Sequence, residues 1–116
     1  MVEYNTHELD RVFAALSDPT RRLLMRRLCV GPATVSELAA PLEMSLNAVS
    51  KHLKVLEQAG LIQRTIKGRV HHISLNAAPL AEAERWVNQY RQFWDARLDS
   101  LDSWLKLDSN RKEEEK

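Results

Sequence analysis

One stretch of the sequence decides the fold: SLNAVSKHLKVLEQAGL, which runs from Ser45 to Leu61. It is typical of a single helix, because Ser45 suits the N-cap and Gly60 suits a left-handed turn after the last residue. Apolar residues recur at helical spacing along one side, which is expected to face a core. These residues are Val49, Leu53 and Leu56.

The other side of this predicted helix is polar and carries no acid. Its residues recur at the same spacing and are Asn47, Ser50, Lys51 and Lys54. A solvent-exposed face with donors, acceptors and cations fits a groove lined with phosphates and base edges. On this segment alone, a solvated amphipathic helix explains the pattern equally well.

The segment after the helix predicts a β-hairpin. Residues 61–66 (LIQRTI) favour a strand, residues 67–69 (KGR) a tight turn, and residues 70–75 (VHHISL) the returning strand. Gly68 supplies the backbone freedom that the turn needs, and the tip is basic. A capped helix followed by a basic-tipped hairpin resembles a winged helix-turn-helix, in which hairpin cations meet the DNA backbone. An ordinary exposed hairpin is the alternative, but helix and hairpin here favour the same partner.

Two more helices are expected before this unit. Asn5 and Glu8 suit the cap of a first helix, with apolar positions at Leu9, Val12, Phe13 and Leu16. Asp18 and Pro19 then predict the start of a second helix. Its buried side is expected at Leu23, Leu24 and Leu28, and Gly31-Pro32 ends it.

A short helix is expected next, immediately before the Ser45 helix. Thr34 and Glu37 have the spacing of a capping box, in which each side chain satisfies the other's backbone donor. The apolar side of this helix is Val35, Leu38, Ala39 and Leu42. Glu43-Met44 forms the connection, and two helices joined by so few residues are a helix-turn-helix.

A long last helix is predicted from about Leu80 to about Leu107. Its apolar stripe is Leu80, Ala83, Val87, Tyr90, Trp94, Leu101, Trp104 and Leu105, widened by Trp86, Phe93 and Leu98. A stripe about 40 Å long exceeds what a small domain can cover, whereas a second copy of the chain can cover it. The alternative is a helix wrapped on its own domain, which part of residues 80–90 fits.

Length and composition suit one domain, residues 1–107, followed by a charged and disordered tail, residues 108–116. The net charge is +1, but its distribution is uneven. Residues 43–76 hold five Lys or Arg and two Glu, a net charge of +3, whereas residues 77–116 carry a net charge of −2. Positive charge on the helix and hairpin is the electrostatic footprint of phosphate binding. The sequence has no membrane-spanning run and no secretion signal.

The order of these elements resembles the ArsR-type family of winged-helix repressors, over nearly the whole chain. Four motifs carry the resemblance: LSDPTRR (16–22), VSELA (35–39), VSKHLKVL (49–56) and AGLI (59–62). It implies a mainly α fold with a small β-hairpin, a winged helix-turn-helix with a long C-terminal dimerisation helix. It also implies a homodimeric, DNA-binding transcriptional repressor in the prokaryotic cytoplasm, at the nucleoid. Many members lose DNA affinity when an inducer, often a metal ion, binds.

The chain departs from the metal-sensing members. Those carry Cys-Val-Cys before an acidic residue and Leu, where this chain has Thr34-Val35-Ser36-Glu37-Leu38. Hydroxyls are poor ligands for soft ions. A second family site uses Asp and His on the last helix, which has no His here. We therefore expect no metal site and no cofactor, and the effector, if there is one, is not identified by the sequence.

The remaining His and Cys residues have simpler explanations. His71 and His72 are neighbours on a strand and point to opposite faces, so sharing an ion is difficult. His71 has some chance of contacting phosphate, and His52 is expected to pack or hydrogen-bond near the turn. Cys29, the only cysteine, is expected to be a buried structural thiol in a reducing compartment, with redox sensing the lesser alternative.

These patterns predict two sets of site residues. Asn47 and Ser50 are expected at base edges, and Leu46 and Ala48 at a thymine methyl. The whole DNA-binding set is Ser45, Leu46, Asn47, Ala48, Ser50, Lys51, Lys54, Arg64, Lys67 and Arg69. The family's use of its first and last helices as a dimer interface implies Leu9, Phe13, Val87, Tyr90, Trp94, Leu98, Leu101, Trp104 and Leu105.

Three other classes of protein are alternatives to this function. An enzyme is not expected, because the sequence has no Gly-rich phosphate loop, nucleophile elbow or His-Glu-x-x-His pattern. A winged-helix protein-interaction module would have a neutral, apolar outer face on residues 47–54, which these residues do not give. A ligand- or redox-gated repressor with a non-standard effector site is compatible with DNA binding and is neither supported nor excluded.

Overall fold

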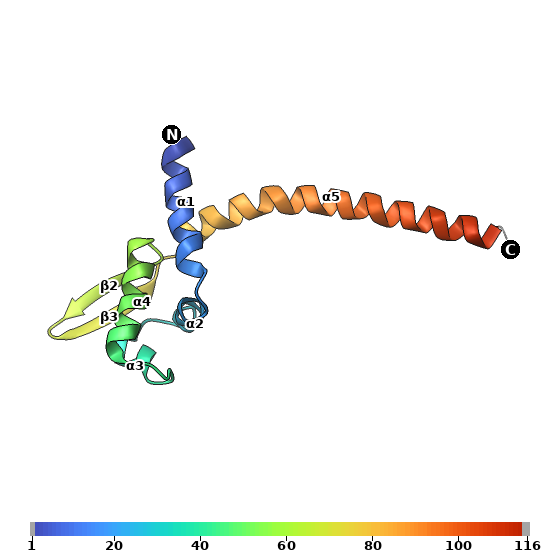
Figure 1. Cartoon of the computed structure of the whole chain (residues 1–116). Helices are drawn as coiled ribbons and strands as arrows, with labels where there is room; N and C mark the ends of the chain where they lie inside the picture. The colour runs from blue at the N-terminus through green and yellow to red at the C-terminus, as the bar shows by residue number, and fades with distance from the viewer. Residues whose placement is uncertain (1, 115–116) are drawn as a thin grey trace. The chain divides into compact units, whose positions relative to one another are not determined.

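The computed structural model describes the backbone of residues 2–114 and the side chains of residues 7–108. Its elements follow in the order shown in Figure 1: α1 (Val2–Leu16), α2 (Pro19–Leu28), β1 (Ala33–Thr34), α3 (Val35–Ala39), α4 (Leu46–Gln58), β2 (Ile62–Lys67), β3 (Val70–Leu75) and α5 (Ala78–Glu114). The chain divides into two units, one up to Ala83 and one from Glu84 onward. The first holds α1 to β3 and the start of α5, and the second holds the rest of α5.

The predicted fold class is confirmed: the first unit is mostly helical with a small antiparallel sheet. The sheet has one strand more than the predicted hairpin, because β1 pairs with β3 on the side away from β2. The strand order is therefore β1-β3-β2. Ala33 pairs with Ile73 and Thr34 with His72, so the third strand supports only the base of the hairpin.

The core of the first unit gathers around one side of α4. Val49, Leu53 and Leu56 are each fully buried, as predicted. Residues from every other element of this unit pack into the same cluster, among them Val12, Leu24, Leu38, Leu61, Ile73 and Ala83. One face of α4 is thus completely used for packing, which fixes the rotation of the helix about its axis.

Two predictions for α1 and α2 were wrong. Asn5 is not a cap, because α1 begins at Val2 and Asn5 lies inside it. On α2 the buried residues are Leu24, Met25 and Leu28, whereas the Leu23 side chain is 54% exposed. The buried face of the helix includes the flexible Met25 and not Leu23. The spacing of the leucines alone does not show which of these two residues faces the core.

The start of α2 is held by the predicted Asp18 cap. Asp18 Oδ2 accepts a hydrogen bond from the Arg21 backbone N–H at 3.1 Å, and Pro19 occupies the first helical position. That backbone hydrogen bond, aided by the positive charge of the Arg21 side chain, holds the pKa of Asp18 below its usual value. The Arg21 guanidinium also donates to the carbonyls of Ala14 and Ala15, so one residue joins the end of α1 to the start of α2.

The short helix α3 has part of the predicted capping box. The Thr34 hydroxyl accepts from the Glu37 backbone N–H at 3.2 Å, as expected. The Glu37 carboxylate, however, accepts from the Thr34 hydroxyl and not from its backbone N–H. The helix ends at Ala39, before the predicted Leu42, because Pro41 lacks the N–H that a further turn requires.

The end of α4 is a Schellman motif. Gly60 has the predicted left-handed backbone, with φ of 77°, and its N–H donates to the Glu57 carbonyl. The Leu61 N–H donates to the Leu56 carbonyl, and the Leu61 side chain enters the core. Asn76, just after β3, donates its side-chain amide to the Gly60 carbonyl at 2.8 Å. The end of the hairpin is therefore fastened to the end of α4.

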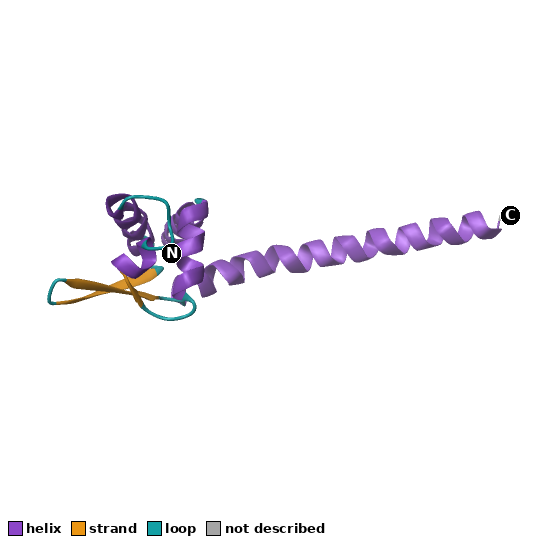
Figure 2. Ribbon diagram, turned by 90° about the horizontal axis from the view of Figure 1, so that it is seen from below, coloured by secondary structure: helices purple, strands orange, loops and turns teal. Residues whose placement is uncertain are grey.

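The hairpin has the predicted turn and extends past the helices of its unit, as Figures 1 and 2 show. Lys67 pairs with Val70 across a two-residue loop. Gly68 has φ of 64° and Arg69 has a negative φ, which fits a type II′ turn with glycine at the first central position.

In the second unit, α5 continues to Glu114 and not only to the predicted end near Leu107. Residues 115 and 116 of the predicted disordered tail lie outside the described residues. Beyond Ala83, none of the described side chains up to Asp108 is buried. No helix among the described residues has the length and apolarity needed to cross a membrane.

We expect the Asp18 cap to make stability depend on pH. Because the folded pKa of Asp18 lies below that of the unfolded chain, about 3.9, its contribution is complete above that value and is lost as pH falls through the folded pKa. The difference in unfolding free energy between wild type and Asp18→Asn should shrink as pH falls from about 5 to about 2.5. Urea denaturation at fixed protein concentration measures it, and a difference independent of pH would contradict the assignment.

Candidate nucleic-acid interface

The polar face of α4 lies open to solvent because the opposite face is buried. The Ser45 hydroxyl accepts from the Ala48 backbone N–H at 3.1 Å and starts the helix where the sequence predicted. Asn47, Lys51 and Lys54 are exposed, and Ser50 is half-buried. The structure therefore brings the predicted polar residues together on one accessible side of a single helix.

The first turn of α4 also offers apolar surface. The Leu46 side chain is 53% exposed, and Ala48 is half-buried. Helix α3 packs against α4 to complete the helix-turn-helix, with the buried Leu38 in the shared core. An exposed helix start with mixed polar and apolar side chains has the form that recognition helices use in a major groove.

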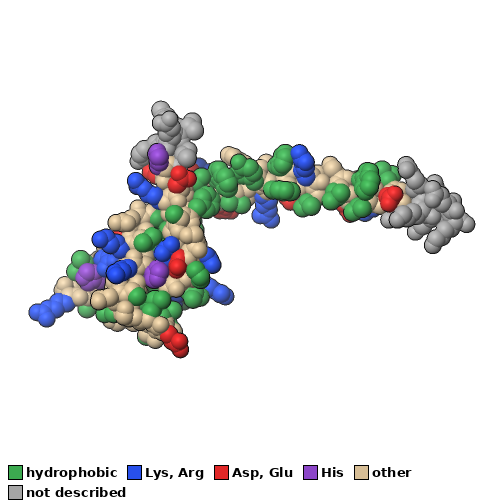
Figure 3. All heavy atoms as spheres, viewed as in Figure 1, with side chains coloured by type: hydrophobic (Ala, Val, Ile, Leu, Met, Phe, Trp, Pro, Cys, Tyr) green, Lys and Arg blue, Asp and Glu red, His purple; other side chains and the backbone are tan. Residues whose placement is uncertain are grey.

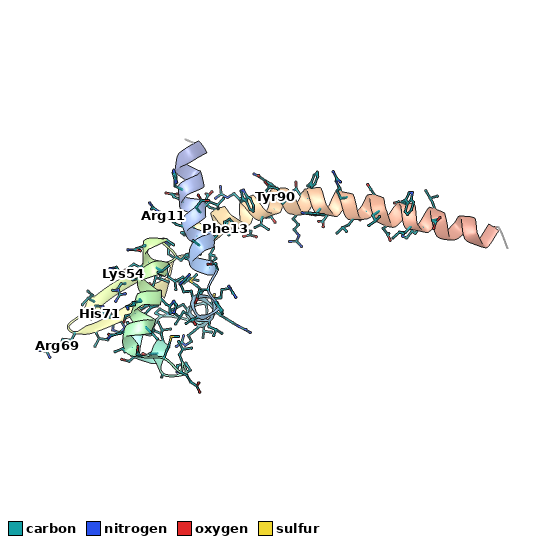
Figure 4. The ribbon with its side chains drawn as sticks, in the orientation of Figure 1. Arg11, Phe13, Lys54, Arg69, His71 and Tyr90 are labelled. Atoms are coloured by element: carbon teal, nitrogen blue, oxygen red, sulfur yellow. The ribbon has the colours of Figure 1, made fainter. Side chains whose placement is uncertain are left out.

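The hairpin tip adds cations to this surface. Lys67 and Arg69 are both exposed. In Figure 4, Lys54, His71 and Arg69 follow one another from α4 out to the tip, and Figure 3 shows Lys and Arg side chains gathered over this side of the first unit. We call this side, made of the polar face of α4 (Ser45–Lys54) and the hairpin tip (Lys67–Arg69), the basic face.

Arg64 differs from the other predicted phosphate contacts. Its side chain is only 20% exposed, and its Nε lies 3.3 Å from Glu57 Oε2 on α4. Its Nη1 lies 2.9 Å from His71 Nδ1 on β3. His71, which was given some chance of contacting phosphate, is thus engaged inside the protein. Glu57 was not singled out by sequence reasoning, because a glutamate in the last turn of a helix gives no signal of its partner.

His52 fulfils the prediction of a hydrogen-bonding role, but its partners lie on another element. Its Nδ1 is 3.3 Å from Arg21 Nη1 and 3.8 Å from Asp18 Oδ2. The shorter distance identifies the hydrogen bond, and since arginine has no acceptor, Nδ1 is the acceptor. Asp18 is too far for a hydrogen bond and acts on His52 through its charge. The contact joins the start of α2 to the middle of α4.

The prediction of a buried Cys29 was wrong. Cys29 is exposed because it caps the C-terminal end of α2, beyond the last core residue, Leu28. Among the residues that the structure describes, no group of three or more His, Cys, Asp or Glu side chains is placed to hold a metal ion.

Sequence comparison agrees with this geometry. Residues 18–64 match the sequence profile of the bacterial regulatory proteins of the ArsR family. The transcriptional repressor SdpR of Bacillus subtilis is 35% identical over 79 residues, which cover 68% of this chain and 88% of SdpR. The chain belongs to the ArsR family.

Solved structures agree with the ArsR assignment. A crystal structure of an ArsR family transcriptional regulator, 40% identical, superposes with a TM-score of 0.73 over 78% of this chain and 93% of that one. The homodimeric winged helix-turn-helix DNA-binding domain of a possible ArsR-family regulator from Mycobacterium bovis superposes with a TM-score of 0.59. It is 22% identical and covers 80% of this chain and 83% of that one, a likeness of fold alone.

The ArsR profile covers only part of the candidate site. Its match runs from the start of α2 into β2. It therefore includes α4 and Arg64, but it does not include Lys67, Arg69 or α5. The profile match therefore says nothing about the roles of the hairpin tip and of α5 in this ArsR protein, and only the structure of this chain bears on them.

The residues predicted for a dimer interface are mostly solvent-accessible in the single chain. Leu9 is partly buried against the core, and Phe13 is 38% exposed. On the second unit, the exposed fractions are between 46% for Val87 and 63% for Trp104. The predicted interface residues that are exposed on α5 are Val87, Tyr90, Trp94, Leu98, Leu101, Trp104 and Leu105. Figure 3 shows hydrophobic side chains, in green, along the described part of this helix.

Proposed function

We propose that the chain is a homodimeric transcriptional repressor that binds a near-palindromic DNA operator in the prokaryotic cytoplasm, at the nucleoid. One observation carries the proposal: the basic face exposes Asn47, Lys51 and Lys54 beside a hairpin tip with Lys67 and Arg69. Side chains of these types read base edges and bind phosphates. The name of the relative SdpR, a transcriptional repressor, supports repression as the output.

Each residue of the basic face has a role in this proposal. Asn47 and Ser50 read base edges, while Leu46 and Ala48 contact a thymine methyl. Lys51 and Lys54 bind guanine or phosphate. Ser45 caps the start of α4. The N-terminus of this helix favours anions and faces the DNA backbone in this proposal. Lys67 and Arg69 bind phosphates beside the groove, and we assign Arg64 a different role below.

Dimerisation explains the second unit. From Glu84 onward, α5 has no buried residue among those described, yet it presents large apolar side chains along one side. Val87, Tyr90, Trp94, Leu98 and Leu101 recur at intervals of three and four residues, so they lie on one face of the helix. A helix with an uncovered apolar stripe is stabilised by packing against another element, and a second copy supplies one.

A twofold axis sets the form of the target. Two copies of α4 related by the axis reach successive major grooves when they are about 34 Å apart, one DNA turn, or a multiple of that distance. The operator is then a near-palindrome. A dimer seated on a promoter blocks polymerase, which is the simplest form of repression.

Selection of bound sites from a random duplex library tests the proposal. We expect selected sites to be near-palindromes with half-sites separated by whole turns of DNA. The same selection with Asn47→Ala should lose base preference at one or two positions in each half-site, because the amide no longer pairs with a base edge. Failure of the wild-type protein to enrich any sequence at low ionic strength would refute sequence-specific binding.

Salt titration tests the phosphate contacts of the hairpin tip. Lys67→Ala and Arg69→Ala each remove one contact from each protomer, so the slope of log K against log salt should become shallower by about 1.8 for the dimer. Lys106→Ala, which removes one exposed cation from α5, is the control and should leave the slope unchanged. Unaltered slopes in both tip variants would mean that the tip does not contact phosphate.

A matched pair of substitutions tests the dimer interface. Leu101→Glu places a charge in the apolar stripe, whereas Ser103→Glu places the same charge on the opposite side of α5. We expect only Leu101→Glu to weaken dimerisation, by roughly a thousandfold, because each of the two protomers loses the burial of a leucine worth about 2 kcal/mol. Analytical ultracentrifugation measures it, and equal dissociation constants for the two variants would place the interface elsewhere.

A further inference from the structure

The alternation of side chains along β2 places Arg64 on the inner face of the hairpin. Ile62 is two residues before Arg64 and is buried, and Ile73, the pairing partner of Arg64 on β3, is also buried. Residues two apart on a strand share a face. Arg64 therefore extends along the side of the hairpin that packs on the core, which explains why its side chain is 20% exposed.

The Arg64 guanidinium joins three elements. It lies 3.3 Å from Glu57 Oε2 on α4 and 2.9 Å from His71 Nδ1 on β3. Arginine has no hydrogen-bond acceptor, so in this contact the Arg64 guanidinium donates and His71 Nδ1 accepts. Both contacts are thus donated by one side chain on β2. We call Glu57, Arg64 and His71 the hairpin tie.

The tie lies where the sheet becomes narrower. Strand β1 reaches only His72 and Ile73 on β3, which pair with Thr65 and Arg64 on β2. Beyond them, the outer part of the hairpin has two strands. A two-stranded hairpin alone is marginally stable in water, so its direction depends on what holds its base.

We propose that Arg64 is a positioning residue: through Glu57 and His71 it fixes the hairpin against α4 and so sets the distance between the α4 polar face and the hairpin-tip cations. The inference rests on the proposed DNA binding and replaces the prediction that Arg64 contacts phosphate. Lys67, the last residue of β2, is three residues from Arg64, about 10 Å of extended chain. A rotation of ten degrees at the base then moves the tip backbone by roughly 2 Å, enough to break a hydrogen bond.

Substitution of Glu57 separates this proposal from simple electrostatics. If Glu57 acts only as a negative charge near DNA, both Glu57→Ala and Glu57→Gln should raise affinity by the same factor. If it positions the hairpin, Glu57→Ala should lower affinity by roughly threefold to tenfold, the size expected for a half-exposed ion pair in each protomer. Glu57→Gln should fall in between, because its amide oxygen still accepts from Arg64.

Glu43→Ala is the matched control. Glu43 is exposed in the connection before α4, and its removal deletes the same charge without touching the tie. We expect unchanged or slightly higher affinity for it. Thermal denaturation checks that each variant is folded. We expect Glu57→Ala to fold, because alanine has the highest helix propensity. Affinities of Glu57→Ala at or above the wild-type value would overturn the proposal.

Arg64 itself is tested by the salt slope. Arg64→Ala should weaken binding without changing the slope, because no phosphate contact is lost, and Arg64→Lys should restore only part of the affinity. A slope shallower by about 1.8, as expected for Lys67→Ala, would identify Arg64 as a phosphate contact and overturn the positioning role.

Nitrogen-15 NMR of His71 tests the tie without DNA. We expect the Nδ1 resonance of His71 to be that of a hydrogen-bonded, unprotonated nitrogen in the wild type, and to shift when Arg64→Ala removes the donor; a protonated Nδ1 in the wild type would rule out the tie. If the wild type binds no duplex, the proposed function fails whatever this spectrum shows. If the wild type binds and Glu57→Ala binds equally well, only the positioning role fails.

Discussion

The structure depends on the complete burial of one side of α4. With Val49, Leu53 and Leu56 inaccessible to solvent, the helix cannot rotate about its axis without exposing a leucine or a valine, at a cost of about 2 kcal/mol for each. The orientation of Asn47, Lys51 and Lys54 toward solvent is therefore a consequence of packing and needs no DNA. The remaining elements of the first unit supply surfaces against which this side of α4 is packed.

The two units of the chain draw their stability from different sources. The first has its own core, whereas the described part of the second has no buried side chain. Helical order in the second unit is then linked by mass action to whatever covers its apolar stripe. In the proposed dimer, the stability of α5 and the formation of the DNA-binding dimer are the same equilibrium, so protein concentration controls both.

Features set by a few adjacent residues could be predicted from the sequence. The Ser45 cap, the Gly60 turn and the faces of α4 all follow from local patterns, and so does the Gly68 turn. Strand β1 was missed because two residues carry no periodicity. The burial of Met25 in place of Leu23, and the exposure of Cys29, depend on which neighbours α2 meets, and those neighbours are distant in sequence.

The candidate site was predictable to the same degree. Side chains that simply extend into solvent, such as Lys51 and Arg69, lie where the sequence placed them. Arg64 does not, although its spacing from Ile62 held the necessary signal. An arginine in register with buried isoleucines faces inward, but its partners Glu57 and His71 could be identified only once the strand and helix were packed together.

The outer part of the hairpin contributes very little to the stability of the fold. Lys67, Arg69 and Val70 are exposed, and in this segment only Gly68, with its left-handed backbone, is constrained in type. Substitutions at the tip therefore leave the core untouched, and in the proposed complex they change how firmly the chain holds the DNA backbone. Such a segment can diverge freely over evolutionary time, so related proteins can come to differ in how tightly, and with what sensitivity to salt, they hold DNA without having to rebuild their scaffold.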